Sequence, residues 1–371
     1  MRIVCISSSK VPSDSANSIQ VMKVCQAFAQ LGQDVILLVP GTRPEGLKPA
    51  DLQLHYGLRT LFNIEWLSVR NRRLFPWEAV RQARRLGADL LYVWPLQSAA
   101  LGLLAGMPSM LELHDFPSGH FGPLWLRLFI ALPGRKRVLP ITDALNRALH
   151  LPLEYTLIAP DGVDLERYIS LPDPESARRE LGLPAASTVI CTGHLYEGRG
   201  EDLFLALAIK FPKVSFVWVG GRSADVKSWK SRAAAQTLSN VIFTGFVPNE
   251  RIPLYQSAAD VLLMPYQLTV ATSSGGNTAA ICSPMKMFEY MAAGRAILTS
   301  DLPVLREVLD ETTAVFCPAD NFGTWESALG GLLTDGKRRQ ALGQRARRAV
   351  GRYSWIERAK RTLEGIYEIS T

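Results

Sequence analysis

Apolar runs rich in β-branched residues alternate with helical stretches along both halves of this 371-residue chain. The runs expected to be strands in the first half are Arg2 to Ser7, Asp34 to Val39, Leu90 to Trp94, Met110 to His114, Arg137 to Ile141 and Thr156 to Ala159. Those in the second half are Thr188 to Thr192, Val214 to Val219, Val241 to Gly245, Val261 to Pro265, Ala296 to Thr299 and Ala314 to Phe316. Strands that alternate with helices form parallel sheets covered by helices. The sequence predicts an α/β fold with two such domains.

Composition narrows the class of protein further. Hydrophobic residues at 47% and charged residues at 20% are ordinary for a globular protein. The five scattered cysteines form no C-x-x-C pair, which argues against a disulfide framework or a zinc site. The first residues read directly as a strand, and no apolar run reaches about 18 residues. We expect a cytoplasmic protein, either soluble or peripheral on the inner face of the membrane.

The net charge of +7 is concentrated in clusters. Basic residues gather at Arg70, Arg72 and Arg73, at Arg81, Arg84 and Arg85, at Arg135, Lys136 and Arg137, and along Lys337 to Arg352. The first three clusters are interleaved with aromatic residues, and the stretch Phe121 to Leu132 is strongly apolar. This mixture suits an anionic membrane surface or a lipid-bearing substrate. A core helix with solvated arginine faces is the alternative, and no nucleic-acid-binding motif accompanies the charge.

The segment from Ser283 to Gly294 predicts a helix that is apolar on nearly every side but carries Lys286 and Glu289. Ser283 suits the N-cap, Pro284 the first helical position and Gly294 the end. A cation in the first turn is unfavourable unless an anion binds there, and free backbone N–H groups and an ammonium together suit a phosphate. Glu289 would then accept hydrogen bonds from sugar hydroxyls. The alternative is an i,i+3 ion pair between the two side chains.

Other candidate site residues follow the predicted strands, where open α/β sheets bind their ligands. His114 ends one strand of the first half, and the glycine-rich turn 193–200 follows the first strand of the second half. Arg199, in that turn, suits bidentate contact with a diphosphate. The alternatives are an exposed loop arginine for Arg199 and a buried structural role for His114.

Taken in order, the motifs resemble a known family. They are G-H-L-Y-E-G-R-G, F-T-G-F-V-P, A-D-V-L-L-M-P, S-P-M-K-M-F-E-Y-M-A-A-G-R-A-I and D-L-P-V-L-R-E, preceded by A-N-S-I-Q-V-M-K, L-H-D and P-D-G-V-D. This set resembles the retaining nucleotide-sugar glycosyltransferases of family 4. The resemblance implies the GT-B fold, with two facing Rossmann-like domains. Residues 1–165 would form the acceptor-side domain, residues 166–352 the nucleotide-sugar domain, and a C-terminal helix in 353–371 would cross back to the first domain.

The resemblance also implies roles for individual residues. Arg199 and Lys286 would hold the diphosphate, Glu289 the ribose, and the backbone at Phe246 and Val247 the base. His114 would face the donor sugar, so the implied catalytic set is His114, Arg199 and Lys286. Gly193, Ser283, Gly276 and Asn277 complete the implied donor-binding set. No metal is required, because Arg199, Lys286 and the helix start at Ser283 would stabilise the charge on the leaving diphosphate. No cofactor is implied, since the nucleotide sugar is itself the substrate.

The chain departs from the family pattern at two places. Ile281 stands where the family often has the first acid of Glu-x7-Glu, so that contact to the donor sugar is either missing or supplied elsewhere, for example by the backbone of residues 275–277. The loop 8–17 lacks a glycine pair that is common in the family.

The function expected is transfer of a sugar from a UDP- or GDP-sugar to an acceptor hydroxyl, in glycan, glycolipid or related glycoconjugate synthesis. The acceptor would be a glycan, a lipid-linked molecule or a small molecule. Two alternatives are a non-catalytic nucleotide-sugar-binding or scaffold protein of a glycan assembly complex, and a GT-B sugar-nucleotide epimerase.

Overall fold

The computed structural model describes residues 1–270 and 278–366, which form two compact units. The first unit comprises Met1–Asp161 together with the C-terminal residues from Trp355, and the second comprises Gly162–Ser354. The sequence places these boundaries at 165 and 353. In the structure the second unit begins and ends at one place, since the Val163 amide donates to the Tyr353 carbonyl at 3.1 Å.

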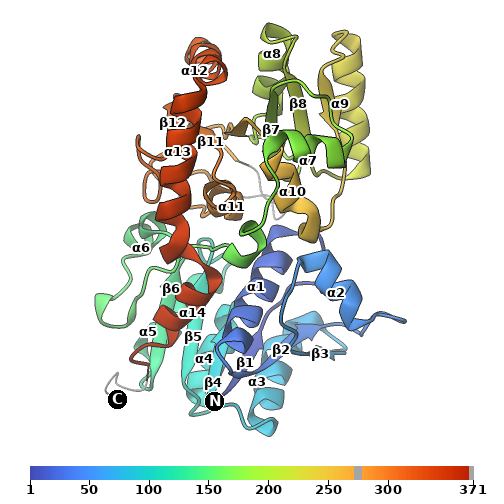
Figure 1. The fold of residues 1–371 in the computed structure, drawn as a ribbon. Coiled ribbons are helices and arrows are strands. Elements are labelled where there is room, and N and C mark those ends of the chain that lie inside the picture. The colour runs from blue at the N-terminus through green and yellow to red at the C-terminus, as the bar shows by residue number, and fades with distance from the viewer. Residues whose placement is uncertain (271–277, 367–371) are drawn as a thin grey trace. The chain divides into compact units, whose positions relative to one another are not determined.

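The first unit contains a six-stranded parallel sheet in the order β3-β2-β1-β4-β5-β6 (Figure 1). Its strands are β1 (Arg2–Ile6), β2 (Asp34–Pro40), β3 (Asn63–Leu67), β4 (Leu90–Val93), β5 (Ser109–Leu113) and β6 (Lys136–Pro140). The order reverses between β1 and β4, which is the switch point of a Rossmann-type sheet.

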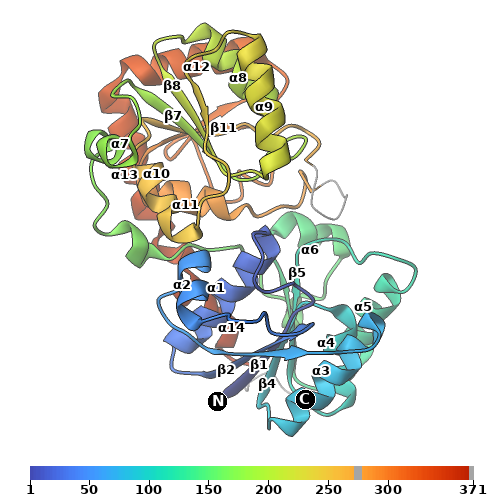
Figure 2. The same ribbon diagram turned by 90° about the vertical axis from the view of Figure 1, so that its right-hand side faces the viewer.

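Helices cover both faces of this sheet. They are α1 (Ala16–Gln30), α2 (Pro49–Tyr56), α3 (Phe75–Arg85), α4 (Leu96–Leu104), α5 (Gly122–Ala131), α6 (Asp143–Leu149) and α14 (Trp355–Leu363), with short 3₁₀ turns at Arg72–Leu74 and Leu153–Tyr155. The C-terminal helix α14 packs beside α1 (Figure 1), while α3, α4 and α5 form a row of neighbours (Figure 2). The last helix of the chain therefore belongs to the first unit.

The second unit repeats the same topology, with strands in the order β12-β11-β10-β7-β8-β9. They are β7 (Thr188–Thr192), β8 (Ser215–Val219), β9 (Val241–Phe243), β10 (Val261–Met264), β11 (Ala296–Ser300) and β12 (Val315–Cys317). Here the order reverses between β7 and β10. Its helices are α7 (Pro174–Leu181), α8 (Glu201–Lys210), α9 (Ser223–Ala235), α10 (Ile252–Ser257), α11 (Met285–Ala293), α12 (Phe322–Thr334) and α13 (Gly336–Ala349), with 3₁₀ turns at Leu165–Tyr168, Asn249–Arg251 and Val350–Tyr353.

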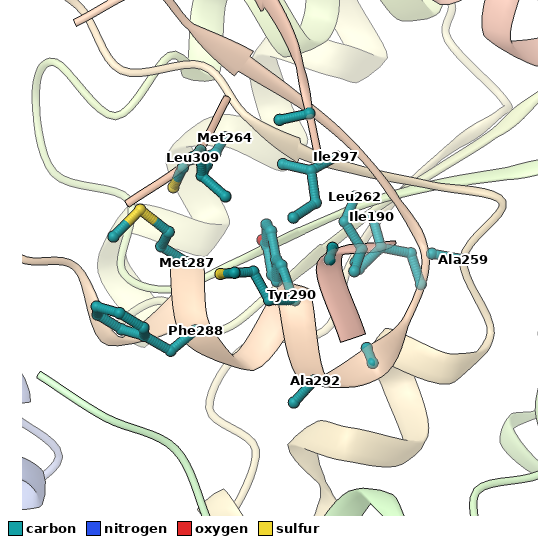
Figure 3. Packing of buried hydrophobic residues seen from close by; sticks show 14 of the residues in the cluster. Ile190, Ala259, Leu262, Met264, Met287, Phe288, Tyr290, Ala292, Ile297 and Leu309 are labelled. Carbon is teal, nitrogen blue, oxygen red and sulfur yellow. The ribbon is translucent and has the colours of Figure 1, made fainter. Parts of the chain in front are cut away.

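Alternate strand residues divide the core of the second unit into two layers. Ile190, Leu262 and Ile297 pack on one face against α11. Figure 3 shows Tyr290 of α11 pointing toward these three side chains. On the other face Cys191 and Trp218 join the cluster formed with α8 and α12. Both faces are apolar, which explains why these strands read as continuous hydrophobic runs.

The predicted α/β fold is confirmed, and the structure changes two strand assignments. Thr156 to Ala159 was expected to be a strand. In this segment the Leu157 amide donates to the Val138 carbonyl of β6 and the Ala159 amide donates to the Pro140 carbonyl. The segment ends at Pro160, which has no amide hydrogen and so cannot continue a ladder of hydrogen bonds. The edge strand β3, by contrast, was not predicted, because its half-exposed N-I-E-W-L sequence lacks a continuous apolar run.

All five cysteines are free thiols. Within residues 1–270 and 278–366, no helix is both long and apolar enough to cross a membrane.

Candidate active site

Two loops meet at the switch point of the second unit. The turn after β7 carries Gly198, whose carbonyl accepts a hydrogen bond from the Gln267 amide, in the loop after β10, at 2.9 Å. Gly198 and Gly200 both have positive φ, and a Cβ at either would collide with a carbonyl oxygen of Thr269 or Pro265. Glycine is therefore needed where the two loops touch. This contact fixes the position of Arg199 between the two glycines.

Arg199 lies against Tyr266, which follows β10. Its Nη1 donates to the Tyr266 hydroxyl at 2.7 Å, and the guanidinium carbon lies 5.0 Å from the ring centroid. Its buried Nε has no hydrogen-bond partner among the described residues. The exposed loop arginine considered above is wrong, since Arg199 is partly buried and held by an aromatic side chain.

Lys286 approaches the same tyrosine from α11. Its Nζ lies 4.9 Å from the centroid of the Tyr266 ring and 3.9 Å from Cys191 Sγ. The side chain passes close to Gly193, because a Cβ built there would be 3.5 Å from Nζ. Lys286 is 9% exposed. The structure thus places Arg199 and Lys286 against the same Tyr266 ring, with Gly193 beside Lys286.

The helix that carries Lys286 begins one residue later than the sequence predicts. Pro284 is the N-cap, without a side-chain cap hydrogen bond, so the prediction of Ser283 as N-cap is wrong. Proline at this position has extended backbone, with ψ of 121°, and α11 starts at Met285. Gly294 ends the helix with φ of 66°, as predicted. Lys286 stays in the first turn, and Ser283 is buried just before it.

Glu289 lies one turn further along α11 and is half-buried. Its Oε2 accepts a hydrogen bond from Gln256 Nε2 at 3.0 Å. No ion pair joins it to Lys286, and both side chains are within the described part of the chain, so the ion-pair alternative is wrong. Tyr290, next to Glu289, accepts a hydrogen bond from the Thr192 amide at 2.8 Å and ties α11 to the end of β7.

Phe246 lies in the turn after β9 and is 51% exposed, whereas Val247 packs against the α11 side of the core. A pocket opens between this turn and α9. It is lined by Ser223, Val226, Lys227, Lys230, Ser231, Ala234, Thr244, Gly245 and Phe246. Gly276 and Asn277 lie outside the described residues. Ile281 is 3% exposed and belongs to the packed interior.

In the first unit, His114 follows β5 and its ring is anchored by Glu112. His114 Nε2 lies 2.7 Å from Glu112 Oε1, which also lies 2.9 Å from Arg358 Nη2 of α14. Glu112 has no exposed side-chain surface, while His114 keeps 28%. Tyr92 and Gln20 also donate to Glu112. The imidazole is thus oriented through Nε2, and Nδ1 is the nitrogen left to meet another group.

Burial and charge act in opposite directions on this cluster. Burial alone would raise the pKa of Glu112, but Arg358, His114 and Tyr92 lower it to about 2. Burial would lower the pKa of His114, yet the Glu112 hydrogen bond and charge, with Asp161, raise it. The pKa of Asp161 is raised to about 6, chiefly by burial. The network keeps Glu112 ionised and favours a protonated His114.

The ligand atoms of Glu112, His114 and Asp161 lie within 4.8 Å of one another, as metal ligands would. The guanidinium of Arg358 already supplies a positive charge at Glu112. A divalent cation would have to displace or repel it. These residues fit an arginine-centred network and do not fit a metal site.

Comparisons with known proteins agree with this architecture. The family described as Glycosyl transferases group 1 matches residues 186–335. The 2-deoxystreptamine N-acetyl-D-glucosaminyltransferase of Streptomyces fradiae is 27% identical, over 74% of this chain and 70% of that protein. The GDP-mannose-dependent alpha-(1-6)-phosphatidylinositol monomannoside mannosyltransferase of Mycolicibacterium smegmatis is 26% identical, over 55% of this chain and 54% of that protein.

Among solved structures, the Anabaena protein HepE in complex with UDP has a TM-score of 0.76 at 17% identity, covering 99% of this chain and 100% of that one. Sucrose-phosphate synthase from Thermosynechococcus elongatus has a TM-score of 0.74 at 18% identity, covering 99% and 98%. The chain has the GT-B fold, and residues 186–335 match the glycosyltransferase family. Both units of the chain are Rossmann-like, as this fold requires.

Sequence reasoning missed several residues of the glycosyltransferase's two clusters. Tyr266 could have been found, because it directly follows a predicted strand at the switch point. Glu112 could have been found as well, since a strand places residues two apart on the same face and Glu112 is two residues before His114. Arg358 carries no such signal, because only the folded chain brings α14 to β5.

Replacing Arg358 by methionine is expected to lower the free energy of unfolding by about 3–5 kcal/mol at pH 7, because it leaves Glu112 ionised and buried without its cation. Chemical denaturation measures this. Lys360→Met is the control, since Lys360 pairs with Glu357 on the exposed side of α14 and should change stability by less than about 1 kcal/mol. Adding Glu112→Gln to Arg358→Met should restore part of the loss. Equal stability of the two single variants would contradict the role assigned to Arg358.

Proposed function

We propose that this glycosyltransferase moves a sugar from a UDP- or GDP-sugar to an acceptor hydroxyl, with retention of configuration, in glycan, glycolipid or related glycoconjugate synthesis. One observation carries the proposal: Arg199 and Lys286 converge on Tyr266 at the switch point of the second unit. Neither cation has a carboxylate within ion-pair distance among the described residues. Both lie at the carboxyl ends of parallel strands, where ligands bind.

The electrostatics of this arrangement favour a dianionic ligand. Removing a cation from water costs several kcal/mol unless an anion joins it. Contact with the Tyr266 ring offsets only part of that cost, since a cation–π contact contributes about 0.5–2 kcal/mol. The diphosphate of a nucleotide sugar would supply two negative charges beside both cations. Free backbone N–H groups at the start of α11 would add to this attraction.

The same groups would act on the transition state. As the bond between the anomeric carbon and the diphosphate oxygen breaks, negative charge grows on the leaving phosphate. Arg199 and Lys286 would stabilise that charge more than the ground state. The acceptor oxygen would form the new bond on the same face of the sugar, and its proton would pass to the leaving phosphate. Two protein cations would fill the role of a metal ion, so the proposed reaction is independent of metal and cofactor.

The remaining contacts follow the family resemblance. Glu289 would bind the ribose hydroxyls, with its present partner Gln256 fixing its orientation. The exposed ring and backbone at Phe246 and the backbone at Val247 would contact the base. His114, oriented by Glu112, would meet the donor sugar. Ser283 and Gly193 would border the diphosphate.

Turnover tests the proposal. The protein is incubated with UDP-, GDP- and ADP-sugars and a panel of glycan, lipid-linked and small-molecule acceptors, and nucleotide release is measured. Release that depends on the acceptor, without loss in a chelator, supports a metal-independent transferase, and the anomeric configuration of the product reports retention. Binding without turnover across the panel would instead favour a nucleotide-sugar-binding protein, the alternative motivated by Ile281.

Lys286→Ala should weaken binding of the donor nucleotide diphosphate by roughly 10- to 100-fold, the loss expected for one charge-assisted hydrogen bond of about 1.5–3 kcal/mol. Calorimetric titration measures the affinity, and circular dichroism checks the fold. Lys210→Ala is the matched control, because Lys210 lies at the far end of α8, where it pairs with Glu326. Unchanged affinity in Lys286→Ala would contradict the assigned role.

We also propose that the first unit contacts an anionic membrane surface. Exposed apolar side chains lie on α3 and at the start of α5, the helices on either side of α4, with Trp77 60%, Phe121 69% and Leu124 54% exposed. Other α5 side chains, Leu126 and Phe129, are buried, so α5 is a core helix on one side only. Exposed Arg81, Arg84 and Arg85 of α3 supply the positive charge. A lipid-linked acceptor would be reached from such a surface.

Replacing Arg81, Arg84 and Arg85 together by glutamine should weaken binding to vesicles that contain anionic lipid by roughly 100-fold, at about 1 kcal/mol for each basic residue. Co-sedimentation measures the bound fraction. The control replaces Lys337, Arg338 and Arg348, three exposed cations of α13, and should bind as the parent does. Equal loss in both triple variants would indicate a general charge effect, and absence of vesicle binding by the parent protein would exclude the surface.

A further inference from the structure

Glu201 is a buried acid that the proposed reaction does not use. It is the first residue of α8, directly after Gly200, and is 5% exposed. Its Oε1 has no hydrogen-bond partner among the described residues. A buried carboxylate with an unpartnered oxygen is costly, so its presence beside Arg199 and Lys286 needs a reason.

The charged groups around Glu201 come from three segments. Arg199 precedes it in the glycine-rich turn, Lys286 approaches from α11, and Asp202 follows it on α8. Burial raises the pKa of Glu201 to about 7, and a hydrogen bond from its own backbone amide and the two cations only partly oppose this effect. Burial also raises the pKa of the Cys191 thiol, where Glu201 adds to the effect and Lys286 and Arg199 oppose it. On α12, which packs on α8, Glu326 instead pairs with Lys210 at the other end of the helix.

Diphosphate binding and an ionised Glu201 compete for the same two cations. A carboxylate near Arg199 and Lys286 neutralises part of their charge and repels an approaching phosphate. A neutral carboxyl does neither, and its O–H becomes a hydrogen-bond donor that a phosphate oxygen can accept. Protonation therefore changes Glu201 from a competitor of the diphosphate into a compatible neighbour.

We propose that Glu201 is a proton-linked residue of the donor site, which takes up one proton from solvent when a nucleotide sugar binds. The carboxylate becomes a neutral carboxyl, no other bond changes, and Arg199 and Lys286 are left to the diphosphate. This inference rests on the proposed function, since it requires that a nucleotide sugar binds between these two cations.

The sign of the pH dependence follows from linkage. A bound diphosphate adds negative charge, which raises the pKa of Glu201 above its value in the free protein. Well below pH 7 the carboxyl is already neutral, so binding takes up no proton. Above that pH, donor affinity falls by up to about tenfold per pH unit until the pKa of the complex is reached. Uptake grows from about half a proton at pH 7 toward one at pH 8.

Calorimetric titration of the full-length protein tests the proposal. UDP-glucose and GDP-mannose are titrated at several values from pH 6 to pH 8.5, in two buffers with different ionisation enthalpies, and the difference in heat gives the protons taken up. Nucleotide sugars are used because a terminal phosphate, with a pKa of about 6, would titrate in this range itself. This measurement on the unaltered protein does not depend on any variant.

Glu201→Gln should abolish the proton uptake and leave donor affinity nearly constant from pH 6 to pH 8.5. The affinity of this variant at pH 8 should exceed that of the parent by up to about tenfold. Glu197→Gln is the matched control, because Glu197 is an exposed acid of the same turn, and it should retain the uptake.

Each outcome decides one of the two proposals. Binding of a nucleotide sugar by the parent protein without proton uptake overturns the role of Glu201 and leaves the glycosyltransferase proposal intact. Uptake that persists in Glu201→Gln also overturns it. Failure of every nucleotide sugar to bind overturns the proposed function and this inference with it.

Discussion

Two cations, the buried Lys286 and the partly buried Arg199, share one tyrosine, and the architecture of the second unit holds them there. Arg199 is held by glycines whose backbone touches the loop after β10, so no side chain can separate the two loops. Lys286 is held by α11, which Tyr290 ties to the end of β7. Both constraints meet where the strand order reverses. The positive charge is therefore preorganised, and a ligand need not supply the energy to assemble it.

The first unit buries a negative charge instead of two positive ones. Its buried carboxylate, Glu112, is fully matched by Arg358, His114, Tyr92 and Gln20. Matched networks rigidify a core, whereas a cluster with unsatisfied members is suited to a ligand. Arg199 Nε and Glu201 Oε1 are such members in the second unit. The cluster in the first unit orients one histidine, whereas the cluster in the second unit includes polar atoms without a hydrogen-bond partner among the described residues.

Most of the fold could be predicted because strands of a parallel sheet are buried on both faces and read as apolar runs. β3 broke the rule, since an edge strand is half-exposed and its residues are mixed. The cations of the site could be predicted because Lys286 stands in a turn that disfavours it and Arg199 in a glycine-rich turn. Glu201 could not be assigned, because its importance depends on burial and on neighbours distant in sequence, whereas Tyr266 could have been found from its place directly after a predicted strand. The N-cap at Pro284 was missed because serine is favoured at the N-cap and proline at the first helical position, which together favoured a helix that starts one residue earlier.

The second unit runs from Gly162 to Ser354, and near its two ends Val163 pairs with Ser354. Everything between them forms one self-contained layer structure, and the chain then returns to complete the first unit through α14. Residues 162–354 could therefore be exchanged in evolution as one block, because the two ends of the block lie next to each other. Such an exchange would leave His114 of the first unit and Arg358 of the C-terminal helix together.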